Sequence, residues 1–110
     1  MSNKPETTET KLPKHGVYVQ GVVVSNTART FKRKDGSGLG VRVSTELALQ
    51  PGMATYDRFF DPVKDSEVKL QGEEVVSFPK LPDLQVVTLR VERYRVYDGR
   101  LFVTGAERVG

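Results

Sequence analysis

An Asp-Gly dipeptide, Asp98-Gly99, separates two runs rich in β-branched and aromatic residues, 85–97 and 100–109. This pattern predicts a β-hairpin with a two-residue type I′ turn, because both central positions of that turn need a positive φ. The short turn fixes the register, so Tyr97 is expected opposite Arg100 and Arg95 opposite Phe102. The strongest local signal in the chain is therefore one of antiparallel β-structure.

The predicted hairpin has two unlike faces, because side chains alternate along a strand. One face carries five arginine or aromatic side chains: Arg93, Arg95, Tyr97, Arg100 and Phe102. Arg93 is expected opposite Thr104. The other face is apolar and is expected to point into a core: Tyr94, Val96, Leu101 and Val103. Cations neutralise phosphates and flat rings stack on unpaired bases, so the first face is typical of a surface that binds single-stranded nucleic acid.

A second Asp-Gly, Asp35-Gly36, predicts an earlier hairpin from strands over 17–31 and 39–49. Its turn would pair Lys34 with Ser37. The apolar pairs in this register are Val22 with Leu49, Val24 with Leu47, Ala28 with Val43 and Thr30 with Val41. The pairs on the other face are Arg29 with Arg42, Phe31 with Gly40 and Arg33 with Gly38.

Two interpretations of this second polar face stay open. Like charges directly opposite destabilise a sheet, so a retained Arg29–Arg42 pair indicates an anion site. Arg29, Phe31, Arg33 and Arg42 are then binding candidates. Alternatively, the face is only solvated, and Phe31 covers the bare backbone of Gly40.

Charge is unevenly distributed along the chain. Overall there are 17 Lys and Arg against 14 Asp and Glu, a net charge of +3. Residues 29–42 hold five basic side chains against one acidic, and residues 90–100 hold four arginines against two acidic groups. Residues 57–74 hold three basic and six acidic side chains. The hairpins are therefore expected to be basic and the middle acidic.

Catalysis, cofactors and metals are not expected. The sequence has no cysteine, its one histidine is His15, and no cluster has metal-ligand spacing. The glycine-rich segment 34–40 lacks the Gly-Lys-Ser/Thr ending of a phosphate-binding loop. No apolar run resembles a signal peptide or a membrane span, so a cytoplasmic location without membrane contact is expected.

The remaining segments complete an all-β expectation. Residues 1–15 are polar and contain two prolines, which predicts a disordered tail before a domain over 16–110. Residues 56–60 predict a third strand, 63–76 either a short helix or an extra hairpin, and 77–84 a loop. The apolar positions change parity between Val91 and Tyr94, which predicts a β-bulge near Glu92. Five strands in this arrangement predict a small, OB-like barrel with two long hairpins.

Four aromatic residues remain ambiguous: Tyr56, Phe59, Phe60 and Phe78. Aromatic side chains in a small β-domain are more often core than exposed. Phe59 and Phe60 are adjacent, so one ring points outward. Phe60, which shares a face with Arg58, would add a stacking position if it were the outward ring.

Two segments resemble a known family. Residues 87–109 are similar to the closing hairpin of the filamentous-phage gene V proteins, which are OB-fold single-stranded-DNA-binding proteins of phages and mobile elements. Residues 33–37 are similar to the basic, glycine-containing loop of that family. The resemblance is confined to these two segments and does not extend to residues 56–84. It implies cooperative coating of single strands by a dimer, with contacts from the arginines and aromatics of the two hairpins.

The sequence thus favours a homodimeric protein that binds single-stranded DNA without sequence specificity and protects replication or transfer intermediates. Two alternatives stay open. One is a β-barrel adaptor or phage structural component that uses the same Arg/Tyr/Phe face to bind protein, since Arg and Tyr also dominate protein interfaces. The other is binding of single-stranded RNA.

Overall fold

Strands account for all the regular secondary structure of residues 16–50 and 52–110, the residues that the computed structural model describes. The predicted tail, residues 1–15, lies outside them. The all-β expectation is confirmed. The seven strands are β1 (Val17–Lys32), β2 (Leu39–Ala48), β3 (Met53–Phe60), β4 (Lys69–Gln71), β5 (Glu74–Ser77), β6 (Val86–Tyr97) and β7 (Arg100–Arg108). No helix that could cross a membrane occurs in these described ranges.

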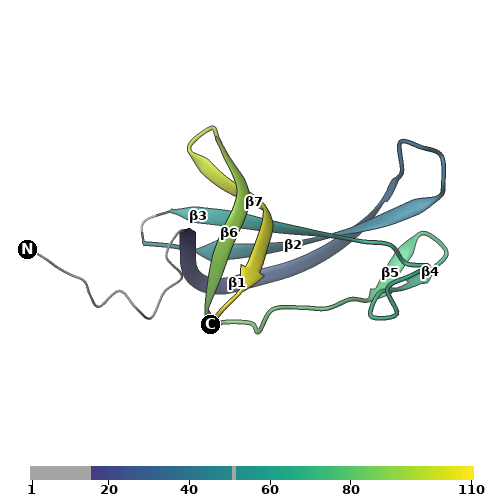
Figure 1. Ribbon diagram of the computed structural model, residues 1–110. Helices are drawn as coiled ribbons and strands as arrows, with labels where there is room; N and C mark the ends of the chain where they lie inside the picture. The colour runs from purple at the N-terminus through teal and green to yellow at the C-terminus, as the bar shows by residue number, and fades with distance from the viewer. Residues whose placement is uncertain (1–15, 51) are drawn as a thin grey trace, which may run out of the picture.

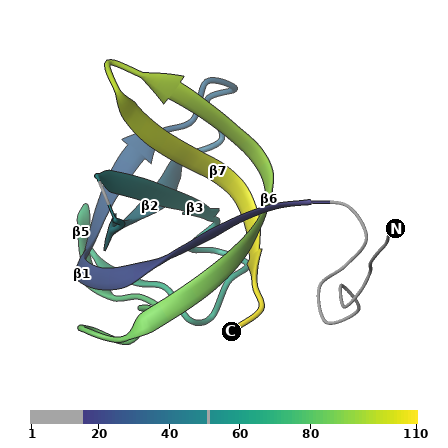
Figure 2. The same cartoon turned by 90° about the vertical axis from the view of Figure 1, so that its left-hand side faces the viewer.

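Five strands form a closed, barrel-like ring in the order β1-β2-β3-β7-β6, with β6 paired back onto β1 (Figures 1 and 2). The β3–β7 pair is parallel and the other four pairs are antiparallel. β4 and β5 form a separate two-stranded hairpin. Of the two alternatives for residues 63–76, the extra hairpin is therefore correct.

The two long hairpins extend beyond the ring. We call residues 29–42 the first arm and residues 93–104 the second arm. Figure 1 shows both arms rising on the same side of the molecule, at opposite ends of β2 and β3. Every residue of β6 after Val91 is exposed, so the arm half of this strand leaves the core behind.

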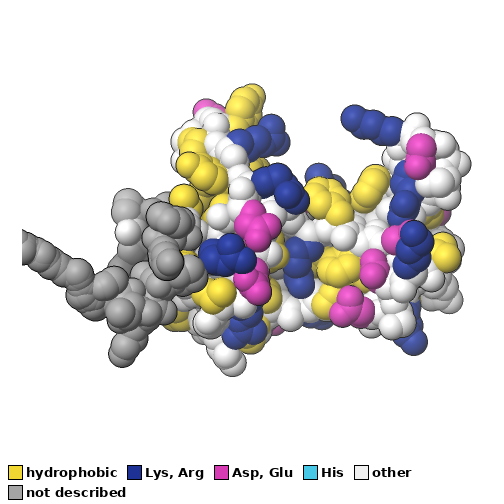
Figure 3. Space-filling model, viewed as in Figure 1, with side chains coloured by type: hydrophobic (Ala, Val, Ile, Leu, Met, Phe, Trp, Pro, Cys, Tyr) yellow, Lys and Arg dark blue, Asp and Glu magenta, His cyan; other side chains and the backbone are white. Residues whose placement is uncertain are grey.

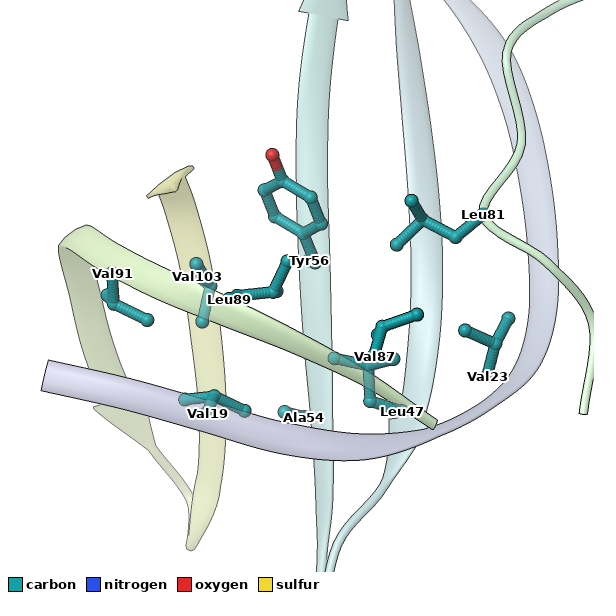
Figure 4. Close-up of a cluster of buried hydrophobic side chains, with 10 residues drawn as sticks. All are labelled: Val19, Val23, Leu47, Ala54, Tyr56, Leu81, Val87, Leu89, Val91 and Val103. Carbon is teal, nitrogen blue, oxygen red and sulfur yellow. The ribbon is translucent and has the colours of Figure 1, made fainter. Parts of the chain in front are cut away.

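The core consists of two clusters that follow the period-two pattern of the strands. The larger cluster lies inside the ring and includes Val23, Leu47, Val87, Leu89 and Val103, all fully buried (Figure 4). The smaller cluster lies below the first arm, where the β4–β5 hairpin covers β2. It contains Val41, Val43 and Val68, with Phe60 and Phe78 packed against them.

A bulge in β1 corrects the predicted register of the first hairpin. The pairs Ala28–Val43 and Phe31–Gly40 are confirmed, but the register shifts between Val23 and Ser25. The shift places Val23, rather than the predicted Val24, opposite Leu47. It likewise pairs Val22 with Ala48 rather than Leu49. Val23 is consequently buried, whereas Val24 is 49% exposed.

The tip of the first hairpin is a wider loop than the two-residue turn that the sequence predicts. The strand pairing ends at Lys32 and Leu39, and the amide of Arg33 then donates to the carbonyl of Gly38 (3.0 Å). The predicted Lys34–Ser37 pair is therefore wrong. Asp35 accepts a hydrogen bond from the Ser37 amide (2.9 Å), and contacts with Ser37 lower the pKa of the Asp35 carboxyl.

The tip of the second hairpin agrees with the prediction. Asp98 and Gly99 have φ values of 53° and 74°, as a type I′ turn requires. Tyr97 lies opposite Arg100, and Arg95 lies opposite Phe102.

Further from this tip, the predicted bulge is confirmed but its effect on the register is larger than expected. The register shifts between Val91 and Arg93 and again between Arg93 and Tyr94. Arg93 therefore lies opposite Gly105 rather than Thr104.

The predicted core face of the second arm is only half correct. Val103 is buried and Leu101 is partly buried, but Tyr94 and Val96 are 53% and 66% exposed. The reason is that the arm rises beyond the ring, so no other strand covers its outer half.

Candidate nucleic-acid interface

Outward-facing side chains of the ring form one continuous surface between the two arms, which we call the outer face. Cross-strand partners in a sheet share a face, so the register defines its rows. One row runs from Arg29 through Arg42 to Phe59. Another runs from Glu46 through Thr55 and Phe102 to Arg95. Figure 3 shows the molecule hollowed between the arms, with hydrophobic and basic side chains on the floor and flanks.

Two phenylalanines lie side by side at the first-arm end of the outer face. The rings of Phe31 and Phe59 meet edge to face, with centroids 6.1 Å apart and planes at 84°. Phe31 covers Gly40 so closely that a Cβ there would lie 2.4 Å from a ring carbon. The proposed protection of Gly40 is thus present, yet Phe31 and Phe59 remain 41% and 56% exposed. Both rings therefore keep surface on which a base can stack.

Phe59, and not Phe60, is the outward ring of this pair. Phe60 packs against the smaller core cluster, and it does share a face with Arg58, whose guanidinium lies 5.8 Å from the Phe60 ring centroid. That face points inward: Arg58 is half-buried and donates to the carbonyl of Pro79 (2.9 Å). Burial lowers the pKa of the Arg58 guanidinium. The exposed ring on β3 is therefore Phe59, one residue earlier than Phe60.

Arg29 and Arg42 stand directly opposite each other, as the sequence predicts. Both side chains are exposed, and neither forms an ion pair with any of the described residues. Two adjacent guanidiniums without a carboxylate partner create a local positive field that favours a bound anion.

Arg33 is held in a different way from Arg29 and Arg42. Its guanidinium forms an ion pair with Asp61 (3.2 Å) and lies partly buried beside the loop. A hydrogen bond from the backbone of Val63, together with Arg33, lowers the pKa of Asp61. Arg33 therefore lies at the edge of the outer face with its charge neutralised by Asp61, whereas Arg29 and Arg42 have no such partner among the described residues.

The second-arm end combines a ring with two guanidiniums. Arg95 and Arg100 place their guanidinium carbons 5.4 and 6.0 Å from the Phe102 ring centroid. Arg100 also donates to the Thr55 hydroxyl (3.1 Å) and forms an ion pair with Glu46. Its charge is therefore matched, whereas Arg95 is exposed without an ion pair among the described residues.

The remaining two site candidates lie on either side of this cluster. Tyr97 is 68% exposed at the arm tip. Arg93 lies across Gly105, where a Cβ would come within 2.9 Å of the guanidinium. The structure thus brings most of the nine predicted site residues to one face, with Arg33 at its edge and Arg93 at the register shift of β6, and only some of the nine have a free charge or ring.

Asp57, a residue that the sequence reasoning did not select, lies in the middle of the outer face. It pairs with Ser44 across β2 and β3, and the Ser44 hydroxyl donates to its carboxylate. A hollow beside it is also lined by Phe59, Arg93 and Thr104. The period-two alternation that places Phe59 outward also places Asp57 outward, so this signal was present in the sequence.

Comparisons with protein-family models, with curated proteins and with solved structures found no match for this chain. In the residues described, no group of three or more His, Asp or Glu side chains is placed to hold a metal ion.

Proposed function

We propose that this protein binds single-stranded nucleic acid, with DNA favoured, across the outer face. One observation carries the proposal: exposed aromatic rings and unmatched arginines occur together at both ends of one hollowed face. Phe31 and Phe59 lie beside Arg29 and Arg42, and Tyr97 lies on the arm that carries Arg95 and Phe102.

This combination suits an unpaired strand better than a duplex. Stacking on an aromatic side chain contributes about 1–3 kcal/mol per base and needs a base that is free of its partner. Arginines that contact phosphates release counterions, so the affinity is expected to fall steeply with salt. Both contributions depend little on sequence, so binding is largely non-specific.

The topology supports the same proposal. A five-stranded ring with a parallel pair between the third and last strands is consistent with the OB-like assignment and with the gene V protein resemblance. In OB-folds the faces of the second and third strands and the loops at the two hairpins bind oligonucleotides. Here β2 and β3 form the floor of the outer face, and the two arms are those hairpins. We accordingly propose protection of replication or transfer intermediates as the role.

A second copy of the chain is the partner that the second arm favours. Tyr94 and Val96 are exposed on the side of the arm opposite Arg95 and Tyr97. In a two-fold dimer each residue of a patch meets the same patch, and an apolar surface tolerates that arrangement without opposing like charges. The same exposed residues favour the adaptor alternative, in which another protein binds there.

Titration of fluorescent oligonucleotides, followed by anisotropy, tests the proposal. Single-stranded DNA, duplex DNA and single-stranded RNA of equal length are compared at two salt concentrations. We expect single strands to bind more tightly than the duplex and the affinity to fall with salt. Tighter binding of RNA would identify RNA as the ligand. Absence of binding to every oligonucleotide at low salt would overturn the proposal in favour of the adaptor.

A further inference from the structure

A carboxylate lies in the centre of a face whose two ends are basic. Asp57 is outward on β3, two residues before Phe59, and it lines a hollow together with Arg93 and Thr104. The side chain is partly buried, so it belongs to the floor and not to the rim. A carboxylate at this position repels phosphate. Its presence on a face proposed to bind nucleic acid therefore has to be explained by a contact other than one to phosphate.

One oxygen of Asp57 is free to accept a hydrogen bond from a ligand. Oδ1 accepts from the Ser44 hydroxyl, and no described residue donates to Oδ2. Glu46 on the same face differs, because Arg100 and the Thr55 hydroxyl both bind its carboxylate. Asp57 is therefore held in place by Ser44 and still has an unused acceptor oxygen. The carboxylate oxygens of Glu46 are already engaged.

In the proposed complex, this charge pattern orients the bound nucleic-acid strand. Phosphates are drawn to Arg29, Arg42 and Arg95 at the two ends and repelled from the centre, so the nucleotide above Asp57 presents its base edge. A carboxylate accepts hydrogen bonds and cannot donate them. The amino groups of cytosine, adenine and guanine satisfy it. At the same edge, uracil and thymine present one N–H that lies between two carbonyl oxygens. The carboxylate repels these oxygens because they too are hydrogen-bond acceptors.

We infer that Asp57 gives the outer face a preference for bases that carry an exocyclic amino group, seen most directly as cytosine over uracil. This inference rests on the proposed binding of single strands and adds to it one position at which the base matters. The expected difference is about threefold to tenfold in affinity, the range of one ordinary hydrogen bond at a partly exposed site.

The test compares deoxycytidine and deoxyuridine 15-mers, which differ only at positions 3 and 4 of the base. Dissociation constants at one salt concentration are measured for the full chain and for Asp57→Asn. A carboxamide both donates and accepts, so the variant is expected to lose most of the cytosine preference. Affinity for both oligomers should rise, because a negative charge has been removed. Glu74→Gln, an exposed position of β5 away from the outer face, removes the same charge and should keep the preference.

Using the ratio of the two affinities cancels differences between the oligomers themselves. An equal cytosine-to-uracil ratio in the wild type and in Asp57→Asn would overturn the inference, even if both bind more tightly. Failure of the wild type to bind either oligomer would instead overturn the proposed function.

A second measurement needs no variant. An oligomer of N4,N4-dimethyldeoxycytidine lacks both amino hydrogens, and the wild-type chain should bind it about as weakly as the deoxyuridine oligomer. Binding as tight as that of deoxycytidine would overturn the inference independently of whether Asp57→Asn folds.

Discussion

Asn26 joins three parts of the chain through one side chain. Its Oδ1 accepts from the Thr45 hydroxyl (2.7 Å) and from the Leu81 amide (3.2 Å), and its Nδ2 donates to the Leu81 carbonyl (3.0 Å). Thr45 is fully buried. The residue lies two positions after the β1 bulge, so it fixes β1, β2 and the segment before β6 where the strand register changes.

Replacing Asn26 by alanine is expected to lower the free energy of unfolding by about 1–3 kcal/mol. The reason is that the Thr45 hydroxyl and the Leu81 amide lose their partner in a site with little water. Urea denaturation measures the change. Gln20→Ala is the matched control, because it removes one exposed side-chain hydrogen bond, to Thr88, and should cost far less. Equal destabilisation by the two variants would contradict this role.

Arg29 and Arg42 give the opposite expectation for stability. Since their like charges oppose each other in the free protein, Arg29→Ala and Arg42→Ala should each leave the melting temperature unchanged or higher. Each should also weaken binding to single-stranded DNA, because no described carboxylate pairs with either arginine and a bound phosphate would relieve the repulsion. Thermal melts and anisotropy titrations test both parts together. A lower melting temperature with unchanged affinity would make the pair structural.

At the scale of elements, the second arm differs from the ring because both faces of its β6 half are exposed, whereas the first arm keeps Val41 buried in the smaller core cluster. The second arm carries Arg95 and Tyr97 on one face and Tyr94 and Val96 on the other. Folding therefore depends little on these side chains, and substitutions there report on binding with little disturbance of the core.

Tyr97→Ala is expected to reduce affinity for oligothymidine by about 1–3 kcal/mol, and Tyr97→Phe to reduce it little, because stacking uses the ring and not the hydroxyl. Tyr94→Ala on the reverse face of the same arm is the control, and it should leave this affinity unchanged when the oligomer is too short to bind two copies. Titrations of the three variants under one set of conditions measure the effect. If Tyr94→Ala were as harmful as Tyr97→Ala, the ring at the arm tip would not be a stacking site.

The sequence predicted correctly those features that depend on neighbouring residues, and it failed for features that depend on distant ones. The Asp98-Gly99 turn and the alternation around it depend on neighbouring residues, and both are confirmed. The bulge near Val24 moved the register by one residue, and the run of three valines at 22–24 does not show in the sequence which of them points inward. Exposure of Val96 depends on how far the arm rises beyond the ring, which is a property of the whole fold.

The same reasoning explains the partial success at the site. Alternation alone correctly assigned one of two adjacent rings to the outer face, but choosing Phe59 over Phe60 required knowing where the β4–β5 hairpin packs. The charge match between Arg100 and Glu46 spans 54 positions of sequence and could not be read from either residue alone.

For the molecule as a whole, our proposal places nucleic-acid binding on the outer face and self-association on the opposite side of the second arm, where Tyr94 and Val96 are exposed. Val96→Lys is expected to convert a dimer into a monomer while single-strand binding by each copy remains. Light scattering coupled to size-exclusion chromatography measures the mass in solution. Val63→Lys, at a position that is 90% exposed in the loop after β3, is the control and should leave the mass unchanged. A wild-type chain that is monomeric at high concentration would contradict the dimer.

The bulge at Glu92 divides β6 into two halves whose local stability should differ. Before it, Val87, Leu89 and Val91 are buried; after it, the strand has no buried side chain. Opening the arm half costs little hydrophobic contact, so its amides should exchange with deuterium well before those of the core half. A bound strand should slow this exchange selectively. Part of the intrinsic binding energy is then used to order the arm, and variants that rigidify it should bind more tightly without making any new contact.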